Sequence, residues 1–246
     1  MSIYASVKTV NLEFHGRRVI FTYPDAGNMT ALLQRIFCGT EYPILALPGY
    51  MPSVIFDIGA NVGATAIYFS MAYPKAQIKC YEPSPQNFDF LTRNTDSFAL
   101  IEKFCFGLAE AEGQARLFFG NSQAMQNSVF CSIETTTTSE TVHLRSASME
   151  LRSLEAGTIL KLDTEGCELA VLEAIRTKLP LLDMIYVEYH SEEDRRAIEL
   201  LVATDFVLAT SHASFPHRGT NHYVARHLIE RFPQLDAMRI KGERLS

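Results

Sequence analysis

The chain has 246 residues, of which 47% are hydrophobic, so it is long enough for one α/β domain with an extension and a buried core. Its formal net charge is −6 and its basic residues are scattered, which argues against a nucleic-acid polymer as partner because phosphate neutralisation needs clustered Lys and Arg. No stretch approaches the roughly 18 apolar residues of a membrane span, and the N-terminus lacks a basic segment followed by a hydrophobic core. The five cysteines are widely spaced and never in C-x-x-C, which disfavours a disulfide framework and a zinc site. We therefore expect a cytoplasmic protein with reduced thiols and no membrane partner.

Residues 1–52 precede the first pattern that is typical of ligand binding. The runs Val7–Phe14 and Arg17–Tyr23 alternate in polarity on either side of a glycine and predict a β-hairpin. Asn28 then precedes Met29–Phe37, where apolar residues recur at helical spacing, and this predicts a capped helix.

In the stretch Ser53–Gly63, a short apolar strand ends at Asp57 and a glycine turn follows; Ala64–Ala72 reads as the helix after it. In a parallel sheet such a turn lies at the carboxyl end of a strand, where ligands bind and the helix N–H groups point into the crevice. A dinucleotide fingerprint would need a glycine in place of Asn61, and Asp57 would repel a pyrophosphate. A cationic ligand suits this turn better.

The next strand pattern, Ala76–Tyr81, ends in Glu82, and Pro83 and Pro85 stop it there. An acidic residue at the tip of the second strand, about 20 residues after the glycine turn, is where the hydroxyls of a nucleoside ribose are held. The pattern therefore predicts that adenosine binds here and that phosphate does not.

The rest of the chain alternates between strand and helix patterns. Further strands are expected at 100–108, 115–119, 142–145, 158–162, 184–189, 206–210 and 221–225, with helices at 85–94, 167–179, 192–203 and 227–240. This alternation indicates a parallel sheet covered on both faces. The polar segment 121–141 is expected to be a long loop, either a lid over a substrate or a surface excursion.

Three motifs in this order resemble the FkbM family of class I S-adenosylmethionine-dependent methyltransferases. They are Asp57-x-Gly59-x-Asn61-x-Gly63, Glu82-Pro83-Ser84-Pro85 and Lys161-x-Asp163-x-Glu165-Gly166-x-Glu168. The resemblance covers roughly 53–225 and implies a Rossmann-like α/β fold, with a seven-stranded, mostly parallel sheet whose last strand is antiparallel. It places a methyltransferase core at 53–226 and a C-terminal tail or helix at 227–246. The extension at 1–52 either covers the active site, as is common in small-molecule methyltransferases, or only packs against the core.

The resemblance implies methylation of an oxygen in a small-molecule acceptor, such as a natural product or sugar, with S-adenosylmethionine as cofactor. A carboxylate or amine acceptor stays open, because no residue separates these from a hydroxyl. A nicotinamide-dependent oxidoreductase and a catalytically silent adenosyl-binding module are the rival classes. The oligomeric state is not determined by the sequence, and a homodimer is compatible with it.

The site residues follow from the resemblance and from the strand tips. The expected cofactor contacts are Asp57, Gly59, Ala60, Asn61, Gly63, Glu82, Ser84, Asn87, Phe106, Gly107 and Asp163. Asp57 is expected to bind the ammonium group of the methionine part or, alternatively, to stabilise the turn. Asp163, Glu188 and His190 are the expected catalytic residues, because they stand at the ends of neighbouring strands. Either His190 or Asp163 serves as general base, with His190 favoured because the unperturbed pKa of histidine lies near neutrality. Alternatively, Asp163 and Glu188, with or without His190, hold a divalent metal; we predict a site without metal.

Overall fold

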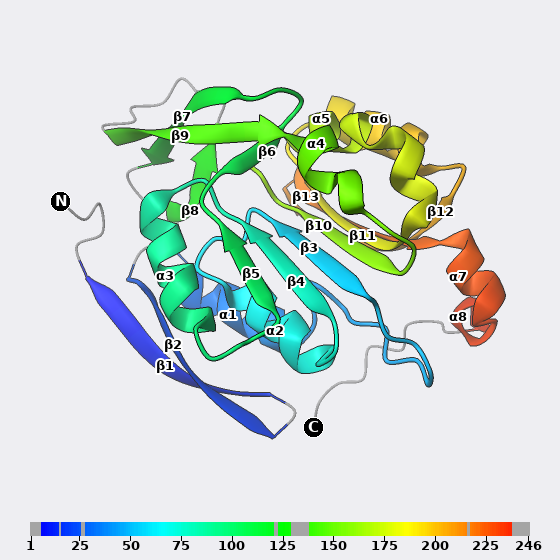
Figure 1. Ribbon diagram of the computed structural model, residues 1–246, viewed down its shortest axis with the longest axis horizontal. Helices are drawn as coiled ribbons and strands as arrows, with labels where there is room; N and C mark the ends of the chain where they lie inside the picture. The colour runs from blue at the N-terminus through cyan, green and yellow to red at the C-terminus, as the bar shows by residue number, and fades with distance from the viewer. Residues whose placement is uncertain are drawn as a thin grey trace.

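The computed structural model describes residues 6–14, 16–25, 28–120, 123–128, 138–215 and 217–237. Its central sheet contains β3 (Val54–Ile58), β4 (Gln77–Tyr81), β5 (Ile101–Phe104), β10 (Thr158–Leu162), β11 (Leu182–Tyr189), β12 (Phe206–Phe215) and β13 (Arg218–Ala225). The strand order is β12-β13-β11-β10-β3-β4-β5, and β13 runs antiparallel to both of its neighbours (Figure 1). The predicted Rossmann-like class I fold, with a seven-stranded and mostly parallel sheet, is confirmed.

Helices cover both faces of this sheet. They are α2 (Ala64–Ala72), α3 (Pro85–Thr95), α4 (Ala147–Glu150), α5 (Glu168–Ala174) and α6 (Glu192–Val202), with short 3-10 turns at Leu151–Ser153 and Arg176–Leu181. The connections β3-α2-β4 and β10-α5-β11 run in opposite directions along the sheet, and right-handed crossovers therefore place α2 and α5 on opposite faces. Near the C-terminus the expected single helix divides at Pro233 into α7 (Arg226–Arg231) and α8 (Gln234–Ala237). None of the helices in the described part of the chain is both long and apolar enough to cross a membrane.

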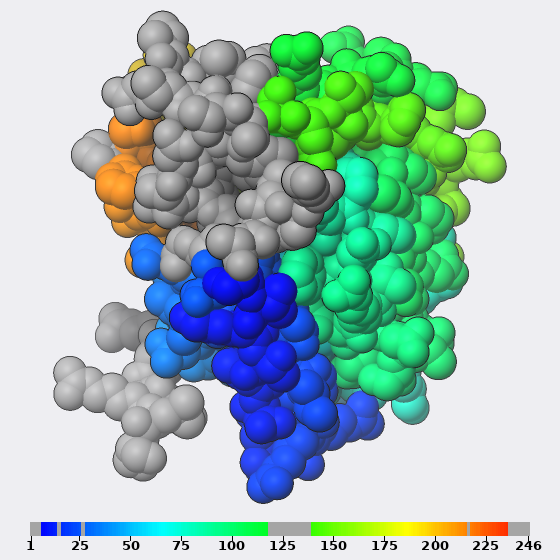
Figure 2. Space-filling model, turned by 90° about the vertical axis from the view of Figure 1, so that its left-hand side faces the viewer, coloured from blue at the N-terminus to red at the C-terminus, as the bar shows by residue number. Residues whose placement is uncertain are grey.

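The N-terminal extension has the predicted elements and is fastened to the core. β1 (Val7–Phe14) and β2 (Arg17–Pro24) form an antiparallel hairpin, and α1 (Met29–Phe37) follows. The Asn94 side chain of α3 accepts a hydrogen bond from the Thr22 amide at 2.9 Å and donates one to the Thr22 carbonyl at 2.8 Å. Figure 2 shows the hairpin in blue against the green surface of α3.

A second sheet lies beyond the carboxyl ends of the central strands (Figure 1). It contains β6 (Gly107–Ala109), β7 (Gly113–Gly120), β8 (Gln123–Ser128) and β9 (Thr138–Ser146) in the order β6-β9-β7-β8. The prediction of one long loop over 121–141 is wrong for 123–128 and for 138–141; residues 121–122 and 129–137 lie outside the described residues. β8 and the first part of β9 escaped prediction because their sequences are polar. Leu117 of β7 and Val142 of β9 form a small separate hydrophobic cluster in this sheet. The expected strand at 100–108 bends at Cys105-Phe106 and contributes to both sheets.

The strand order reverses between β3 and β10, and this is the point where ligands bind in open α/β sheets. Gly59, just after β3, has a φ of +81°, and a Cβ atom there would lie 1.8 Å from the Asp163 carbonyl oxygen. The glycine is therefore required by the close contact between two strand ends, in addition to its left-handed backbone.

We predict that Gly59→Ala destabilises the protein far more than Gly49→Ala. Gly49 has a φ of +80° but nothing within 4 Å of its Cβ position. Its substitution therefore lowers the free energy of unfolding only by the strain of a left-handed alanine, about 1–2 kcal/mol. Gly59→Ala adds a collision with main-chain atoms and is expected to cost at least about 3 kcal/mol in the free energy of unfolding. Urea denaturation of both variants measures the difference. Equal losses would show that the strand ends can separate without cost.

Candidate active site

A cavity of about 550 Å³ opens at the carboxyl ends of the central strands. One part of its wall is formed by Ile58, Gly59, Asn61, Glu82, Pro83, Asn87, Gly107, Leu108, Leu117 and Leu144. The other part is formed by Asn28, Leu32, Arg35, Glu41, Asp163, Thr164, Glu165, Cys167, Glu188, His212, Ala213, Ser214, Phe215, Arg218 and Thr220. We call these the glycine-turn part and the acidic part of the cavity. The acidic part includes residues of the N-terminal extension.

The structure brings most of the predicted site residues to this cavity. Those that line it are Gly59, Asn61, Glu82, Asn87, Gly107, Asp163 and Glu188. Those that do not line it are Asp57, Ala60, Gly63, Ser84, Phe106 and His190. Ser84 instead caps α3, where its hydroxyl accepts a hydrogen bond from the Asn87 amide.

Glu82 is the one carboxylate among the described residues that line the glycine-turn part. Its carboxylate accepts hydrogen bonds from the Asn61 amide at 2.8 Å and from the Ser84 amide at 2.9 Å. Burial raises the pKa of Glu82 to about 7, although both amides act to lower it. Asn61 has a φ of +50°, and its buried Oδ1 atom has no hydrogen-bond partner among the described residues. This part of the cavity therefore offers acceptor atoms to a ligand that donates hydrogen bonds.

Asp57 lies beneath the turn instead of facing the cavity. The strand was expected to end at Asp57 but continues to Ile58, which takes the position at the cavity wall. Asp57 is fully buried, and Lys161 Nζ, from the neighbouring β10, lies 3.0 Å from its Oδ1 atom. The same ammonium group donates a hydrogen bond of 2.6 Å to the Gly59 carbonyl. This position suits the alternative interpretation of Asp57 as a carboxylate that stabilises the turn.

Asp163 and Glu188 form a coupled pair of carboxyl groups in the acidic part. Burial acts to raise the pKa of Asp163, but the charge of Lys161, 3.8 Å away, lowers it below its ordinary value. Burial and the negative charge of Asp163 raise the pKa of Glu188 well above its ordinary value. The Tyr42 hydroxyl donates a hydrogen bond of 3.2 Å to Asp163 Oδ2. Of the two carboxyl groups, Glu188 therefore loses its proton at the higher pH.

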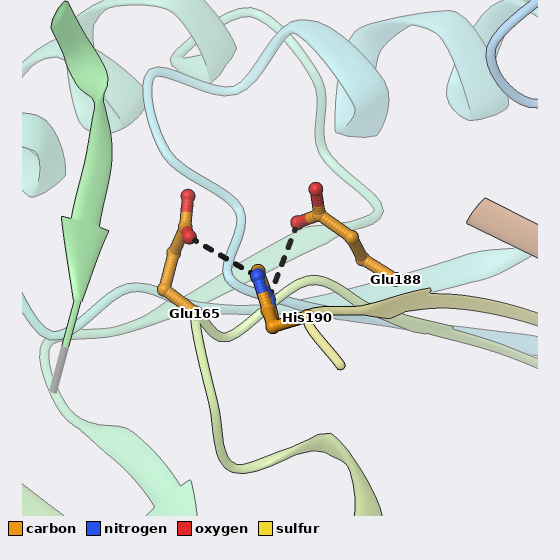
Figure 3. A group of neighbouring side chains, drawn as sticks. All are labelled: Glu165, Glu188 and His190. Atoms are coloured by element: carbon orange, nitrogen blue, oxygen red, sulfur yellow. Dashed lines mark ion pairs between the residues drawn. The ribbon is translucent and has the colours of Figure 1, made fainter. Parts of the chain in front are cut away.

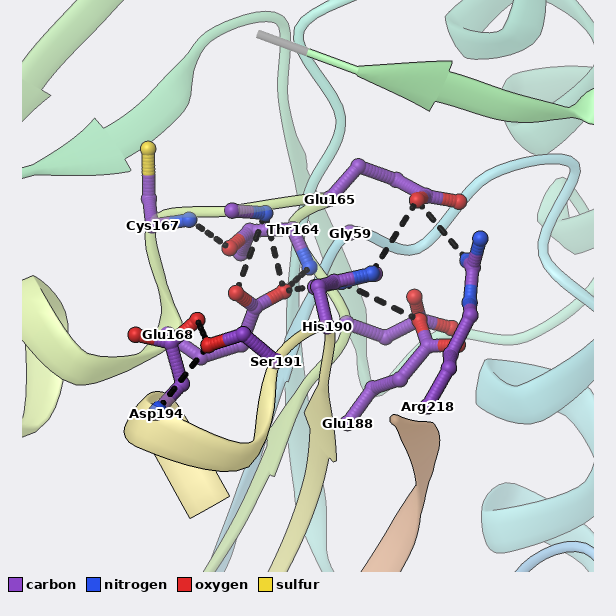
Figure 4. Close-up of polar contacts among 12 residues, drawn as sticks. Gly59, Thr164, Glu165, Cys167, Glu168, Glu188, His190, Ser191, Asp194 and Arg218 are labelled. Atoms are coloured by element: carbon purple, nitrogen blue, oxygen red, sulfur yellow. Dashed lines mark hydrogen bonds and ion pairs between the residues drawn. The ribbon is translucent and has the colours of Figure 1, made fainter. Parts of the chain in front are cut away.

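Arg218, at the start of β13, balances this cluster (Figure 4). It donates hydrogen bonds of 2.9 Å from Nε to Glu188 and from Nη2 to Glu165. Burial and nearby negative charge raise the pKa of Glu165 to about 8, and this residue has an unusual φ of +59°. Sequence reasoning missed Arg218 because it began the last strand at Asn221, three residues too late; the available signal was a lone arginine beside the predicted strand.

His190 is not among the residues that line the cavity, and its ring lies between the carboxylates of Glu165, Glu168 and Glu188 (Figures 3 and 4). Its Nε2 atom is 3.4 Å from Glu168 Oε1 and 3.6 Å from Glu188 Oε2. Burial acts to lower the pKa of His190, but the hydrogen bond and charge of Glu168 raise it above its ordinary value. Glu168 also accepts hydrogen bonds from the Thr164 and Gly166 amides at 2.7 and 3.0 Å, so it fixes the loop before α5. The imidazole therefore contacts Glu188 instead of facing the cavity.

Glu165, Glu188 and His190 each offer one ligand atom within 4.8 Å of the others (Figure 3). This set differs from the alternative metal set expected from the sequence, since Glu165 takes the place of Asp163. Arg218 already supplies positive charge to both carboxylates. The geometry thus favours a guanidinium-balanced cluster over a divalent ion, and a site without metal stays a prediction.

Residues 57–219 match the methyltransferase FkbM domain. The chain belongs to this family. The assignment made from the three sequence motifs is confirmed, and the matched FkbM segment contains all of the cavity wall except its N-terminal contributions and Thr220.

Curated relatives of this FkbM chain carry methyltransferase names. It is 28% identical over 152 residues to the hexuronic acid methyltransferase AglP of Haloferax volcanii, covering 61% of each protein. It is 29% identical over 177 residues to methyltransferase sdnD of Sordaria araneosa, covering 58% of this chain and 68% of that protein. The solved FkbM structure from Methylobacillus flagellatus aligns at 16% identity with a TM-score of 0.49, over 76% of this chain and 47% of that one. The chain therefore spans about three fifths of the archaeal relative and less than half of the solved protein.

We predict that Lys161→Met strongly destabilises this FkbM protein. Removal of the ammonium group leaves Asp57 as an unpaired buried carboxylate, and the expected cost is about 3–5 kcal/mol in the free energy of unfolding. Lys8→Met is the matched control, because Lys8 and Asp25 form a 2.7 Å pair that is largely exposed and is expected to contribute little to the free energy of unfolding. Chemical denaturation measures both. If Asp57→Asn fails to restore part of the stability lost in Lys161→Met, the unpaired charge is not the cause.

Proposed function

We propose that this protein transfers a methyl group from S-adenosylmethionine to a hydroxyl oxygen of a small-molecule acceptor. The observation that carries the proposal is the Glu82 carboxylate, which two backbone amides hold at the tip of β4 beside the glycine turn. A carboxylate in that position accepts hydrogen bonds from the two hydroxyls of a nucleoside ribose. Family membership supports the same chemistry.

The residues of the glycine-turn part fit an adenosyl group. Asn61 Oδ1 is a buried acceptor that lacks a partner among the described residues, and Pro83 and Leu108 provide apolar surface beside it. No Lys or Arg is among the described residues that line this part, so it suits a nucleoside better than a diphosphate. When bound, S-adenosylmethionine supplies an electrophilic methyl group on a positively charged sulfur.

The acidic part of the cavity provides the groups for the acceptor. Glu188 lines the cavity, and its raised pKa makes its ionised form a comparatively strong base for a hydroxyl proton. Asp163 stays ionised and supplies negative charge close to the glycine turn. His190 was the favoured base from the sequence, but its position supports a positioning role, because it does not line the cavity and contacts Glu188 at 3.6 Å.

S-adenosylhomocysteine is expected to stabilise the protein against heat, whereas NADH is not. Ribose hydroxyls donate to ionised Glu82, so ligand binding favours the ionised form and lowers the pKa from its free value of about 7. The dissociation constant of S-adenosylhomocysteine should therefore rise about fivefold from pH 7 to pH 6 and change little above pH 8. Isothermal titration calorimetry measures this dependence.

Glu82→Gln provides the control for that titration, because an amide does not ionise. It is expected to bind S-adenosylhomocysteine weakly and without the pH dependence between 6 and 7. Stabilisation by NADH alone, or a pH dependence that persists in Glu82→Gln, would contradict the proposed cofactor site.

The rate of methyl transfer is expected to rise with pH, with a midpoint above the ordinary pKa of a glutamate. Glu188 must lose its proton to act as base, and its pKa is raised, so activity is low on the acidic side and approaches a plateau on the basic side. Asp163→Asn removes the charge that raises this pKa and should move the midpoint to lower pH. Profiles of kcat against pH at saturating cofactor measure the shift. Unchanged midpoints in Asp163→Asn, or full activity in Glu188→Gln, would eliminate Glu188 as the base.

A further inference from the structure

The acidic part of the cavity presents its charges as pre-formed pairs on opposite walls. On the N-terminal side, Arg35 Nε lies 2.7 Å from Glu41 Oε2. On the sheet side, Arg218 binds Glu188 and Glu165. Both pairs line the same cavity. Each wall therefore offers hydrogen-bond donors and acceptors together while its charge is largely balanced.

This arrangement selects among acceptor classes. A carboxylate acceptor would bring another negative charge next to ionised Asp163, where both arginines already have carboxylate partners. An apolar acceptor would displace water from these charged groups without replacing the hydrogen bonds that the water made. A hydroxyl group donates and accepts at once, so several hydroxyls on one molecule match both walls.

An aromatic ring completes the wall at the β12–β13 hairpin. Phe215 lines the cavity although 57% of it is exposed, and its ring stacks on His217 at 6.5 Å. The face of an aromatic ring carries partial negative charge, which attracts the weakly positive C–H groups on one face of a sugar ring. An exposed ring beside paired carboxylates therefore suits a molecule that is polar at its edge and less polar on its face.

The N-terminal side of the acidic part lies outside the segment that matches the family. Arg35 and Glu41 precede residue 57, where the match to the family begins. Tyr186 donates a hydrogen bond of 2.5 Å to the Pro43 carbonyl, and Tyr42 reaches Asp163, so this segment is anchored beside the acidic cluster. Its side chains are thus placed to distinguish acceptors without altering the cofactor half of the cavity.

We propose that the acceptor is a neutral, hydroxyl-rich ring compound of the sugar type, which Arg35–Glu41 and Arg218 hold from opposite walls and Phe215 covers on one face. This inference rests on the proposed methyltransferase function. It makes Arg35 and Phe215 specificity-determining residues.

The test uses the full chain with S-adenosylmethionine and four probes: methyl glycosides of neutral hexoses, the corresponding glucuronides, catechol and cyclohexanol. Neutral glycosides are expected to be the preferred acceptors and to give a methyl ether, which resists mild alkali. Preference for glucuronides with an alkali-labile methyl ester, or preference for catechol or cyclohexanol, would overturn the inference.

Variants test the two walls separately. Arg35→Met should raise the KM for the glycoside about tenfold, since it removes a charged hydrogen-bond donor, and Phe215→Ala should raise it about threefold. Both should leave the dissociation constant of S-adenosylhomocysteine unchanged. Arg18→Met is the matched control, because Arg18 and Glu13 form a largely exposed pair in the β1–β2 hairpin, and it should change neither constant. An unchanged KM in Arg35→Met and Phe215→Ala would overturn the assignment of these walls.

The outcomes separate this inference from the function on which it rests. Saturation-transfer NMR measures whether neutral glycosides bind to the complex with S-adenosylhomocysteine. If S-adenosylhomocysteine binds but the glycosides neither bind nor become methylated, the inference fails and the cofactor proposal stands. If S-adenosylhomocysteine does not bind, the proposed function itself fails.

Discussion

One buried ammonium group connects the parts on which the site depends. Lys161 extends from β10 to Asp57 on β3, to the Gly59 carbonyl and towards Asp163. Buried charges are tolerated only when they are paired and hydrogen-bonded, so this lysine fixes the relative position of two strand ends that lie far apart in the sequence. The close approach of Gly59 to Asp163 occurs at the same place. Lys161 and this close contact thus hold the glycine turn and the acidic part of the cavity in a fixed relative position.

The two parts of the cavity differ in chemical character, and this difference follows from the topology. The glycine-turn part is built by β3, β4 and the segment near β6, and it holds one isolated carboxylate. The acidic part gathers residues from β10, β11 and the β12–β13 hairpin, together with the N-terminal extension. Because parallel strands end at one edge, side chains from these separate segments meet across the switch point. Cofactor binding and acceptor recognition can therefore depend on different segments.

The sequence predicted the central fold well where apolar runs and glycines coincide, as in Ser53–Ala72, because burial on both faces leaves a strong pattern. It failed for β8 and the first part of β9, because their sequences are polar and carry no regular apolar pattern. Glu82 and Asp163 were placed correctly at the cavity since each directly follows a strand. Asp57 and His190 do not line the cavity. One more strand residue follows Asp57, and His190 contacts Glu168. Arg218 depends on a pairing between distant strands, which local patterns do not encode.

The position of Arg218 near the end of the chain has a consequence for biosynthesis. As the polypeptide leaves the ribosome, the parallel strands from β3 to β11 are complete before β13 exists, and domains form from the N-terminus onwards. During that interval Glu165 and Glu188 lack their guanidinium partner. The acidic part of the cavity consequently acquires its final electrostatic balance only when β13 pairs with β11, so its completion depends on a contact between segments far apart in the sequence.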